Sequence, residues 1–291
     1  RLTDLNLGHW ELFEEPKEGS LVLTLPKNEY FVARPPQLDV MTSSVCAIDF
    51  GTKSTVVACR DQNQDERLLR IGQGDYTKAA ELEDYENPTV VELLDIENFL
   101  KAYRGRGGRP FTEWNQMTVS HQAEDALKKA KNSMVYYSVF SELKQWANDK
   151  ERRLMLRDRK GNLVELRSYE ELQDGDFDPI ELYAYYLGLY INNMHRGIYL
   201  DYILSFPVTY EMVMRERILH SFERGLKKSL PPALLRDEDM MRRFRVYAGA
   251  SEPAAYAISA LQEFGLEPKK DGEVVSYAVF DFGGGTTDYD F

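Results

Sequence analysis

Short apolar runs and periodic apolar positions alternate along the chain, as in a protein that contains both strands and helices. Runs rich in β-branched and aromatic side chains, bounded by Gly, Pro, Asn or Asp, are typical of strands. Such runs occur at residues 21–25, 30–33, 45–50, 56–58, 88–92, 154–157, 163–166, 199–206, 244–247 and 278–280. Apolar residues spaced three and four apart indicate helices, which we predict over residues 124–131, 180–196 and 213–228.

Turn residues and helix caps mark the boundaries of these predicted elements. Asp178 and Pro179 place a capping carboxylate and a proline where a helix begins, and they predict the start of the helix that follows. Residues 159–162 join the two strands of a predicted hairpin. Two stretches show no regular pattern. We expect residues 97–118 to be irregular and residues 231–239 to form a loop.

Glycines and hydroxyls follow a carboxylate after the apolar run at residues 278–280. The carboxylate is Asp281, and the residues after Phe282 are Gly283, Gly284, Gly285, Thr286, Thr287 and Asp288. Successive glycines let the backbone approach a ligand closely, and their N–H groups can surround an anion. The hydroxyls can donate to phosphate oxygens, and the carboxylate suits a hydrated Mg²⁺ ion. This stretch therefore predicts a strand that leads into a phosphate-binding turn.

The same order of residues occurs earlier in the chain, after the run at residues 45–50. That run ends in Asp49 and Phe50, and the turn that follows consists of Gly51, Thr52, Lys53 and Ser54. One such stretch is also compatible with a plain β-hairpin. Two of them, with three glycines in the second, favour two halves of a protein that face one polyphosphate. A Walker-type phosphate loop is excluded, because Ala47 and Thr52 replace the glycines that it requires.

The paired hairpins resemble the phosphate-1 and phosphate-2 motifs of the actin-like ATPase superfamily, which includes actin, the sugar kinases and the heat-shock-protein-70 (DnaK-type) chaperones. Further segments resemble motifs of the chaperone branch and follow its order. They are Pro88-Thr89-Val90-Val91, residues 119–123 (similar to Val-Gly-x-x-Ala), Lys144 after a Phe-containing turn, Ser205-Phe206-Pro207 and Ser251-Glu252-Pro253-Ala254-Ala255. The resemblance implies an α/β, actin-like ATPase (ribonuclease H-like) fold, with the N-terminal lobe and the start of the second lobe.

The resemblance also implies how the chain is divided. Residues 1–42 are expected to form an N-terminal β-rich extension, which the chaperones do not normally carry. The other parts are a first-lobe core at residues 43–96 and 197–272, an inserted subdomain at 97–196, and the start of the second lobe at 273–291. The adenosine-binding stretch and the peptide-binding domain of the family would come after Phe291. We therefore expect the chain to be part of a longer protein.

The resemblance further implies roles for individual residues. Asp49 and Asp281 would hold Mg²⁺, mainly through its waters, and ATP or ADP would bind between the two hairpins. Lys144 and Glu252 would lie near the attacking water and, with Asp281, would be the catalytic residues. The backbone that clasps the β- and γ-phosphates would come from Gly51, Thr52, Lys53, Gly283, Gly284, Gly285 and Thr286.

Two of these positions leave alternatives open. Lys128 or Lys131 could take the role expected of Lys144. Lys53 stands where the chaperones usually carry a second hydroxyl. A cation at that position could tighten phosphate binding, and it could also displace Mg²⁺ or slow turnover. Alternatively, Lys53 could point outward from the tip of the hairpin.

Composition and charge narrow the class of partners. The 291 residues are 43% hydrophobic and 29% charged, as in ordinary globular proteins. The net charge of −12 disfavours a broad nucleic-acid or anionic-membrane surface, and no apolar run approaches the roughly 18 residues of a membrane span. Cys46 and Cys59 are expected to be reduced thiols of a cytoplasmic protein rather than a disulfide. The four histidines show no metal-ligand spacing.

Together these expectations describe the N-terminal part of an ATP-binding, ATP-hydrolysing chaperone similar to heat-shock protein 70. Its partners would be nucleotide and, through regions beyond Phe291, client proteins and co-chaperones. Three alternatives share the paired hairpins: a sugar or acetate kinase, an actin-like filament or scaffold protein, and a degenerate ATPase that binds nucleotide without turnover. The chaperone-like segment around Glu252, and the lack of a recognisable sugar-binding segment, weigh against the kinase.

Overall fold

The computed structural model shows a mixed α/β protein. It describes residues 26–27, 35–60, 63, 65–72, 78–105, 109–110, 112–113, 115–194, 197–207, 210–282 and 287–291. The strands predicted at residues 21–25 and 30–33 lie outside these ranges. Within the ranges, no helix is both long enough and apolar enough to cross a membrane.

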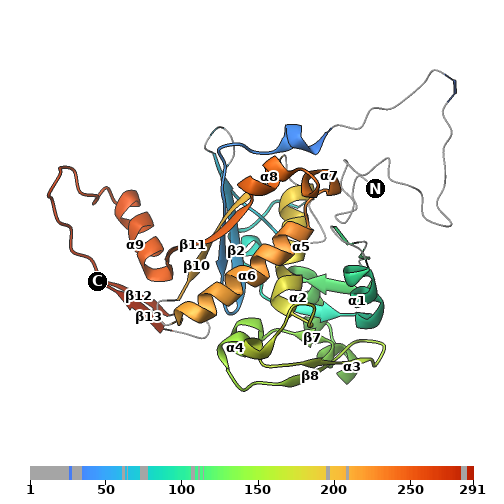
Figure 1. Ribbon diagram of the computed structural model, residues 1–291. Helices are drawn as coiled ribbons and strands as arrows, with labels where there is room; N and C mark the ends of the chain where they lie inside the picture. The colour runs from blue at the N-terminus through green and yellow to red at the C-terminus, as the bar shows by residue number, and fades with distance from the viewer. Residues whose placement is uncertain are drawn as a thin grey trace.

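A six-stranded sheet forms the centre of the molecule (Figure 1). Its strands run in the order β11-β10-β1-β2-β3, and β4 pairs with β2. β1, β10 and β11 are parallel, whereas β1 and β2 form an antiparallel hairpin. The bounds are β1 (Cys46–Phe50), β2 (Ser54–Arg60), β3 (Glu66–Leu68), β4 (Asn87–Pro88), β10 (Asp201–Phe206) and β11 (Arg245–Ser251).

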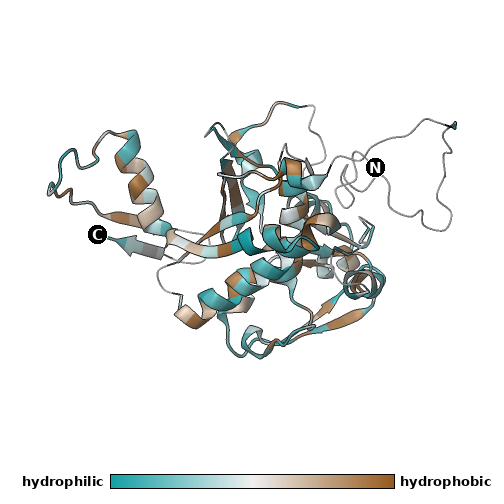
Figure 2. Ribbon diagram, turned by 45° about the horizontal axis from the view of Figure 1, so that its top comes forward, coloured by the Kyte–Doolittle hydropathy of each residue, from teal (hydrophilic) through white to brown (hydrophobic). Residues whose placement is uncertain are grey.

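Two long helices pack together against one face of this sheet (Figure 1). α5 (Pro179–Met194) is apolar on nearly all sides, whereas α6 (Met212–Lys228) carries both hydrophilic and hydrophobic residues along its length (Figure 2). The ring of Phe50 in β1 lies 6.1 Å from that of Tyr183 in α5 and 5.1 Å from that of Phe222 in α6. The helices cross closely at Gly225, because a Cβ there would lie 2.2 Å from the carbonyl oxygen of Glu181.

Several predicted elements are confirmed. Asp178 caps α5, because its Oδ1 accepts hydrogen bonds from the backbone N–H groups of Ile180 at 2.9 Å and Glu181 at 3.1 Å. The predicted hairpin forms at the expected residues, and the helix predicted at residues 124–131 also forms but begins four residues and ends three residues earlier. They are β8 (Leu154–Arg157), β9 (Leu163–Leu166) and α2 (Ser120–Lys128).

A three-stranded sheet and several short helices lie beside the central core (Figure 1). The strands run in the order β6-β5-β7. The 3₁₀ helices in the described part of the chain are η2 (Pro36–Asp39), η3 (Leu82–Tyr85) and η4 (Tyr169–Glu171). The strands and short α-helices beside the central core are β5 (Val91–Leu93), β6 (Met117–Val119), β7 (Val139–Phe140), α1 (Ile96–Arg104), α3 (Ser133–Tyr137) and α4 (Leu143–Asn148). Most of them fall in the range expected for the inserted subdomain, whereas α5, from the same range, packs on α6.

The last elements lie on the side of the central sheet away from α5 and α6 (Figure 1). α9 (Glu252–Glu263) follows β11 directly, and the hairpin of β12 (Val279–Phe282) and β13 (Thr287–Asp290) packs against it. This arrangement brings the end of the chain back to the side of the sheet at which the C-terminal end of β1 lies.

Two expectations about irregular segments are wrong. Residues 97–118 contain α1, whose buried Ile96, Phe99 and Tyr103 lie on one face at helical spacing, and Asp95 caps it by accepting from the N–H of Asn98 at 3.3 Å. Residues 231–239 contain α7 (Pro232–Leu235) and the start of α8 (Glu238–Arg243). A proline at the first helical position and a capping aspartate begin these two short helices.

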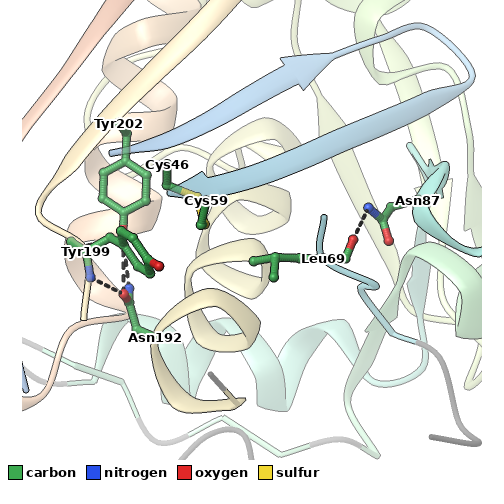
Figure 3. Close-up of a disulfide and its surroundings, with 7 residues drawn as sticks. All are labelled: Cys46, Cys59, Leu69, Asn87, Asn192, Tyr199 and Tyr202. Atoms are coloured by element: carbon green, nitrogen blue, oxygen red, sulfur yellow. Dashed lines mark hydrogen bonds between the residues drawn. A yellow bond between two sulfur atoms is a disulfide. The ribbon is translucent and has the colours of Figure 1, made fainter. Parts of the chain in front are cut away.

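The two cysteines form a disulfide, so the expectation of reduced thiols is wrong (Figure 3). Cys46 of β1 and Cys59 of β2 lie directly opposite each other in the antiparallel ladder, and both are buried. Their spacing in the sequence does not reveal this pairing, because the register of a hairpin depends on the geometry of its turn.

Candidate functional site

A cavity of about 620 Å³ opens beside the turn between β1 and β2. It is bounded by this turn, by η3, α2 and α4, by the start of α9 and by β12. Asp49 and Asp281, which are separated by most of the chain, both line it. The other expected residues that line it are Gly51, Thr52, Lys53, Lys128, Lys144 and Glu252.

Strand alternation directs Asp49 towards the cavity. Its two neighbours in β1 are buried against the helices, so the side chain of Asp49 lies on the opposite, exposed face of the strand. Ser205 is its partner in the parallel register of β1 and β10, and the Ser205 hydroxyl donates to Asp49 Oδ1 at 2.7 Å. At Gly51 a Cβ would lie 2.3 Å from the carbonyl oxygen of Ser54, so the turn requires glycine.

The second carboxylate comes from the hairpin of β12 and β13. In this hairpin Asp281 pairs with Asp288, and Asp281 is half-buried. The two strands confirm the predicted strand that leads into a turn. The expected phosphate-binding residues of the turn itself lie outside the described part of the chain, and they are Gly283, Gly284, Gly285 and Thr286.

Lys144 and Glu252 form a buried ion pair at the cavity. The Lys144 Nζ lies 3.0 Å from Oε1 of Glu252, and the two side chains are 4% and 14% exposed. Lys144 belongs to the first turn of α4, and Glu252 is the first residue of α9, 108 positions later. The Lys144 Nζ also lies 5.6 Å from the centroid of the Tyr210 ring. These contacts hold the lysine at one position on the wall of the cavity.

The segment that begins at Pro207 connects α6 with this lysine. Arg215 of α6 donates to the carbonyl oxygen of Tyr210 at 2.9 Å and to that of Pro207 at 3.3 Å. Tyr210 in turn lies beneath the ammonium group of Lys144. A shift of α6 would therefore act on the position of Lys144 through two hydrogen bonds and one aromatic ring.

The alternative lysines differ in their surroundings. Lys128 lines the cavity, and its Nζ lies 2.7 Å from Oε2 of Glu124 in an exposed pair within α2. Lys131 is exposed and does not line the cavity. Lys144 is buried and paired across two elements, so the geometry favours Lys144 for a fixed role at the site.

Among the described residues that line the cavity, carboxylates outnumber lysines. The lining carboxylates are Asp49, Glu83, Asp84, Glu86, Glu124, Glu252 and Asp281, and the lining lysines are Lys53, Lys128 and Lys144. This excess would repel a bare polyphosphate, whereas a bound divalent cation would offset the repulsion.

The lining residues fit Mg²⁺ as part of a nucleotide complex. In the ranges that the structure describes, no three His, Cys, Asp or Glu side chains are grouped so that they could hold a metal by themselves. Mg²⁺ is usually bound by one or two carboxylates together with waters and substrate phosphates. Asp49 and Asp281 place two carboxylates at one cavity, and these two residues would hold the ion there.

Sequence reasoning missed the wall of the cavity opposite the hairpin turn. His121 of α2 shares a hydrogen bond of 2.9 Å between its Nε2 and the carbonyl oxygen of Asp84, which joins α2 to the 3₁₀ turn η3. Glu83 and Glu86 come from the same turn and also line the cavity. No local pattern marks these residues, because their position depends on how η3 packs on α2.

α2 starts from a backbone conformation that is unusual for its side chain. Ser120 has φ 55°, and within the described ranges it is the only non-glycine residue with a positive φ. The left-handed region disfavours residues that carry a Cβ. The chaperone pattern that residues 119–123 resemble has a glycine at this position.

A second polar cluster lies between α5 and α6, away from this cavity. Glu181 accepts from Arg224 at 2.5 Å and from Lys228 at 2.7 Å, and Asp178 accepts from Ser221 at 2.6 Å and from Arg224 at 2.9 Å. Burial raises the pKa of the Asp178 carboxyl. Burial also acts to raise the pKa of Glu181, but its pairing with Lys228 and Arg224 leaves that pKa below its usual value. The cluster joins the two core helices.

No protein-family model matches the chain, and no curated protein matches it significantly.

Proposed function

We propose that the chain is part of an ATP-binding, ATP-hydrolysing protein with an actin-like ATPase fold, similar to the nucleotide-binding region of heat-shock-protein-70 chaperones. The observation that carries this proposal is the position of Asp49 and Asp281 on one cavity. Each follows an apolar strand segment and precedes a turn with glycine and hydroxyl residues. Two such turns at one cavity suit the two sides of a metal-bound polyphosphate.

The parts needed for phosphoryl transfer to water can be assigned to this chain. Phosphoryl transfer requires positioning and neutralisation of charge more than covalent chemistry. Asp49 and Asp281 would hold Mg²⁺ through its waters, and the metal would neutralise charge on the phosphates. The Lys144 ammonium would stabilise charge on the transferred group, and the Glu252 carboxylate would orient the attacking water. The backbone at Gly51 would contact the phosphates.

The chaperone branch is favoured over the kinases by the pairing of Lys144 with Glu252. In the chaperone pattern both positions belong to the site, and here they meet at 3.0 Å on the wall of the cavity. Client proteins and co-chaperones are the partners that this branch implies. A panel of sugars in an ATP-turnover assay tests the kinase alternative, and sedimentation with ATP tests the filament alternative.

Calorimetric titration of Mg-ATP and Mg-ADP into the full-length protein tests the proposal. We expect saturable binding by the wild type that disappears when EDTA removes Mg²⁺. Asp49→Asn and Asp281→Asn should each weaken binding of Mg-ATP by at least tenfold, since each removes a carboxylate from the metal site. Asp239→Asn is the matched control, because Asp239 is highly exposed on α8. No binding by the wild type, or equal effects of all three variants, would overturn the proposal.

A further inference from the structure

Thr89 holds the turn between β1 and β2 without lining the cavity itself. The residue follows β4 and is 1% exposed. Its backbone N–H donates to the carbonyl oxygen of Lys53 at 2.9 Å, and its hydroxyl donates to the carbonyl oxygen of Gly51 at 2.9 Å. One residue thus binds two carbonyl groups of the same short turn.

The geometry of the peptide bond means that these two hydrogen bonds fix the direction of the N–H groups of the turn. In a planar trans peptide the C=O and N–H groups point in opposite directions. Since the carbonyls of Gly51 and Lys53 point to Thr89, the N–H groups of Thr52 and Ser54 point away from it. Thr52 and Ser54 line the cavity, whereas Thr89 does not. The two donors are therefore turned to the side on which an anion would bind.

The hydroxyl of Thr89 is itself held in place by a buried network. Thr89 Oγ1 lies 2.9 Å from Thr55 Oγ1. A hydroxyl has one proton, and because Thr89 uses its proton on Gly51, Thr55 donates to Thr89. The backbone carbonyl of Thr55 accepts from Asn87 at 3.0 Å, and Asn87 also donates to the carbonyl of Leu69 at 3.0 Å. Figure 3 shows the contact between Asn87 and Leu69.

We infer that Thr89 is a positioning residue for phosphate binding: it orients the amide groups of the turn at residues 51–54 towards the terminal phosphates of the nucleotide. The inference rests on the proposed nucleotide-binding function of the cavity. It adds a residue that does not touch the ligand and that acts through the backbone of the turn. Fixing these donors before the ligand binds removes an ordering cost that would otherwise weaken affinity.

The test replaces Thr89 with valine, which keeps the shape and the backbone N–H but removes the hydroxyl. Thr89→Ser, which keeps the hydroxyl, is the rescue variant. Thr112→Val is the matched control, because Thr112 is also buried and its hydroxyl lies 3.0 Å from that of Tyr185 in the core. Affinity of the full-length protein for Mg-ATP is measured by calorimetry, and the backbone order parameters of the Thr52 and Ser54 amides are measured by NMR relaxation on the ligand-free protein.

Thr89→Val should weaken Mg-ATP binding by roughly three- to tenfold, the range expected for one lost hydrogen bond. The order parameters of the Thr52 and Ser54 amides should fall in this variant. Thr89→Ser and Thr112→Val should match the wild type in both measurements. Unchanged affinity and order parameters in Thr89→Val would overturn this inference and leave the proposed function standing. A wild-type protein that does not bind Mg-ATP would overturn both.

Discussion

The ion pair of Lys144 and Glu252 gives a quantitative prediction. Both side chains are largely removed from water, and their charged atoms are 3.0 Å apart. Two substitutions keep the size of the side chains and remove one charge each: Lys144→Met and Glu252→Gln. The double variant removes both charges at once, so the three proteins and the wild type complete a double-mutant cycle.

The expected loss of unfolding free energy depends on which charge remains buried after the substitution. Removing one partner of a buried pair costs about 3–5 kcal/mol when the remaining charge stays buried. Lys144 is 4% exposed, so Glu252→Gln should cost about 3 kcal/mol by leaving the ammonium without its carboxylate. Glu252 is 14% exposed, so Lys144→Met should cost less, about 1–2 kcal/mol. The double variant leaves no buried charge and should cost no more than about 2 kcal/mol.

Urea unfolding measures these free energies. Fluorescence of Trp146 is a suitable probe, because this residue is fully buried in α4, two positions after Lys144. The predicted coupling between the two substitutions is about 2 kcal/mol or more. Additive effects, with a coupling below about 0.5 kcal/mol, would show that the two charges do not stabilise each other and would refute the reasoning.

Three further predictions concern other parts of the fold. Ser120→Gly should raise the free energy of unfolding by about 1 kcal/mol, because glycine adopts positive φ without a steric cost. In urea unfolding the control Ser120→Ala should bring no such gain in stability, and an equal gain for both variants would contradict the backbone explanation. Glu181→Gln should destabilise the protein at pH 7, and in urea titrations the difference in unfolding free energy between variant and wild type should narrow as the pH falls below 4.5, because a carboxyl whose pKa is lowered by folding loses its stabilising effect in acid. The exposed control Glu165→Gln should show no such trend, and a Glu181→Gln difference that stays constant with pH would count against the charge cluster. Reduction of the Cys46–Cys59 disulfide by dithiothreitol should lower the free energy of unfolding by about 2–4 kcal/mol. Urea unfolding with and without the reductant measures this change, and an unchanged urea midpoint would contradict a disulfide in the folded protein.

Elements with strong local signals could be predicted from the sequence. Asp178 and the proline after it mark the start of α5, because a side-chain cap depends on residues within one turn. The hairpin of β1 and β2 is likewise visible from an apolar run, a carboxylate and Gly51. α1 could not be predicted in the same way, because the helical spacing of Ile96, Phe99 and Tyr103 covers only two turns and glycines follow it directly.

The candidate site could be predicted only in part. Asp49, Asp281, Lys144 and Glu252 were selected through the order of motifs, and the structure brings them to one cavity. The bond from Ser205 to Asp49 depends on the parallel register of β1 and β10, which no local pattern determines. The contacts of Thr89 have the same origin, because the segment after β4 meets the turn between β1 and β2 only when the sheet forms. The disulfide depends instead on the register of the β1–β2 hairpin.

The central claim is that one metal–triphosphate complex is held by carboxylates from both hairpins. Electron paramagnetic resonance of Mn²⁺, which can replace Mg²⁺, measures this directly when the metal is titrated with and without ATP. We predict that the wild type binds Mn²⁺ tightly only when ATP is present, and that Asp49→Asn and Asp281→Asn each abolish this ATP-dependent binding. If either variant retained the wild-type signal, its carboxylate would not belong to the metal site and the account would be contradicted.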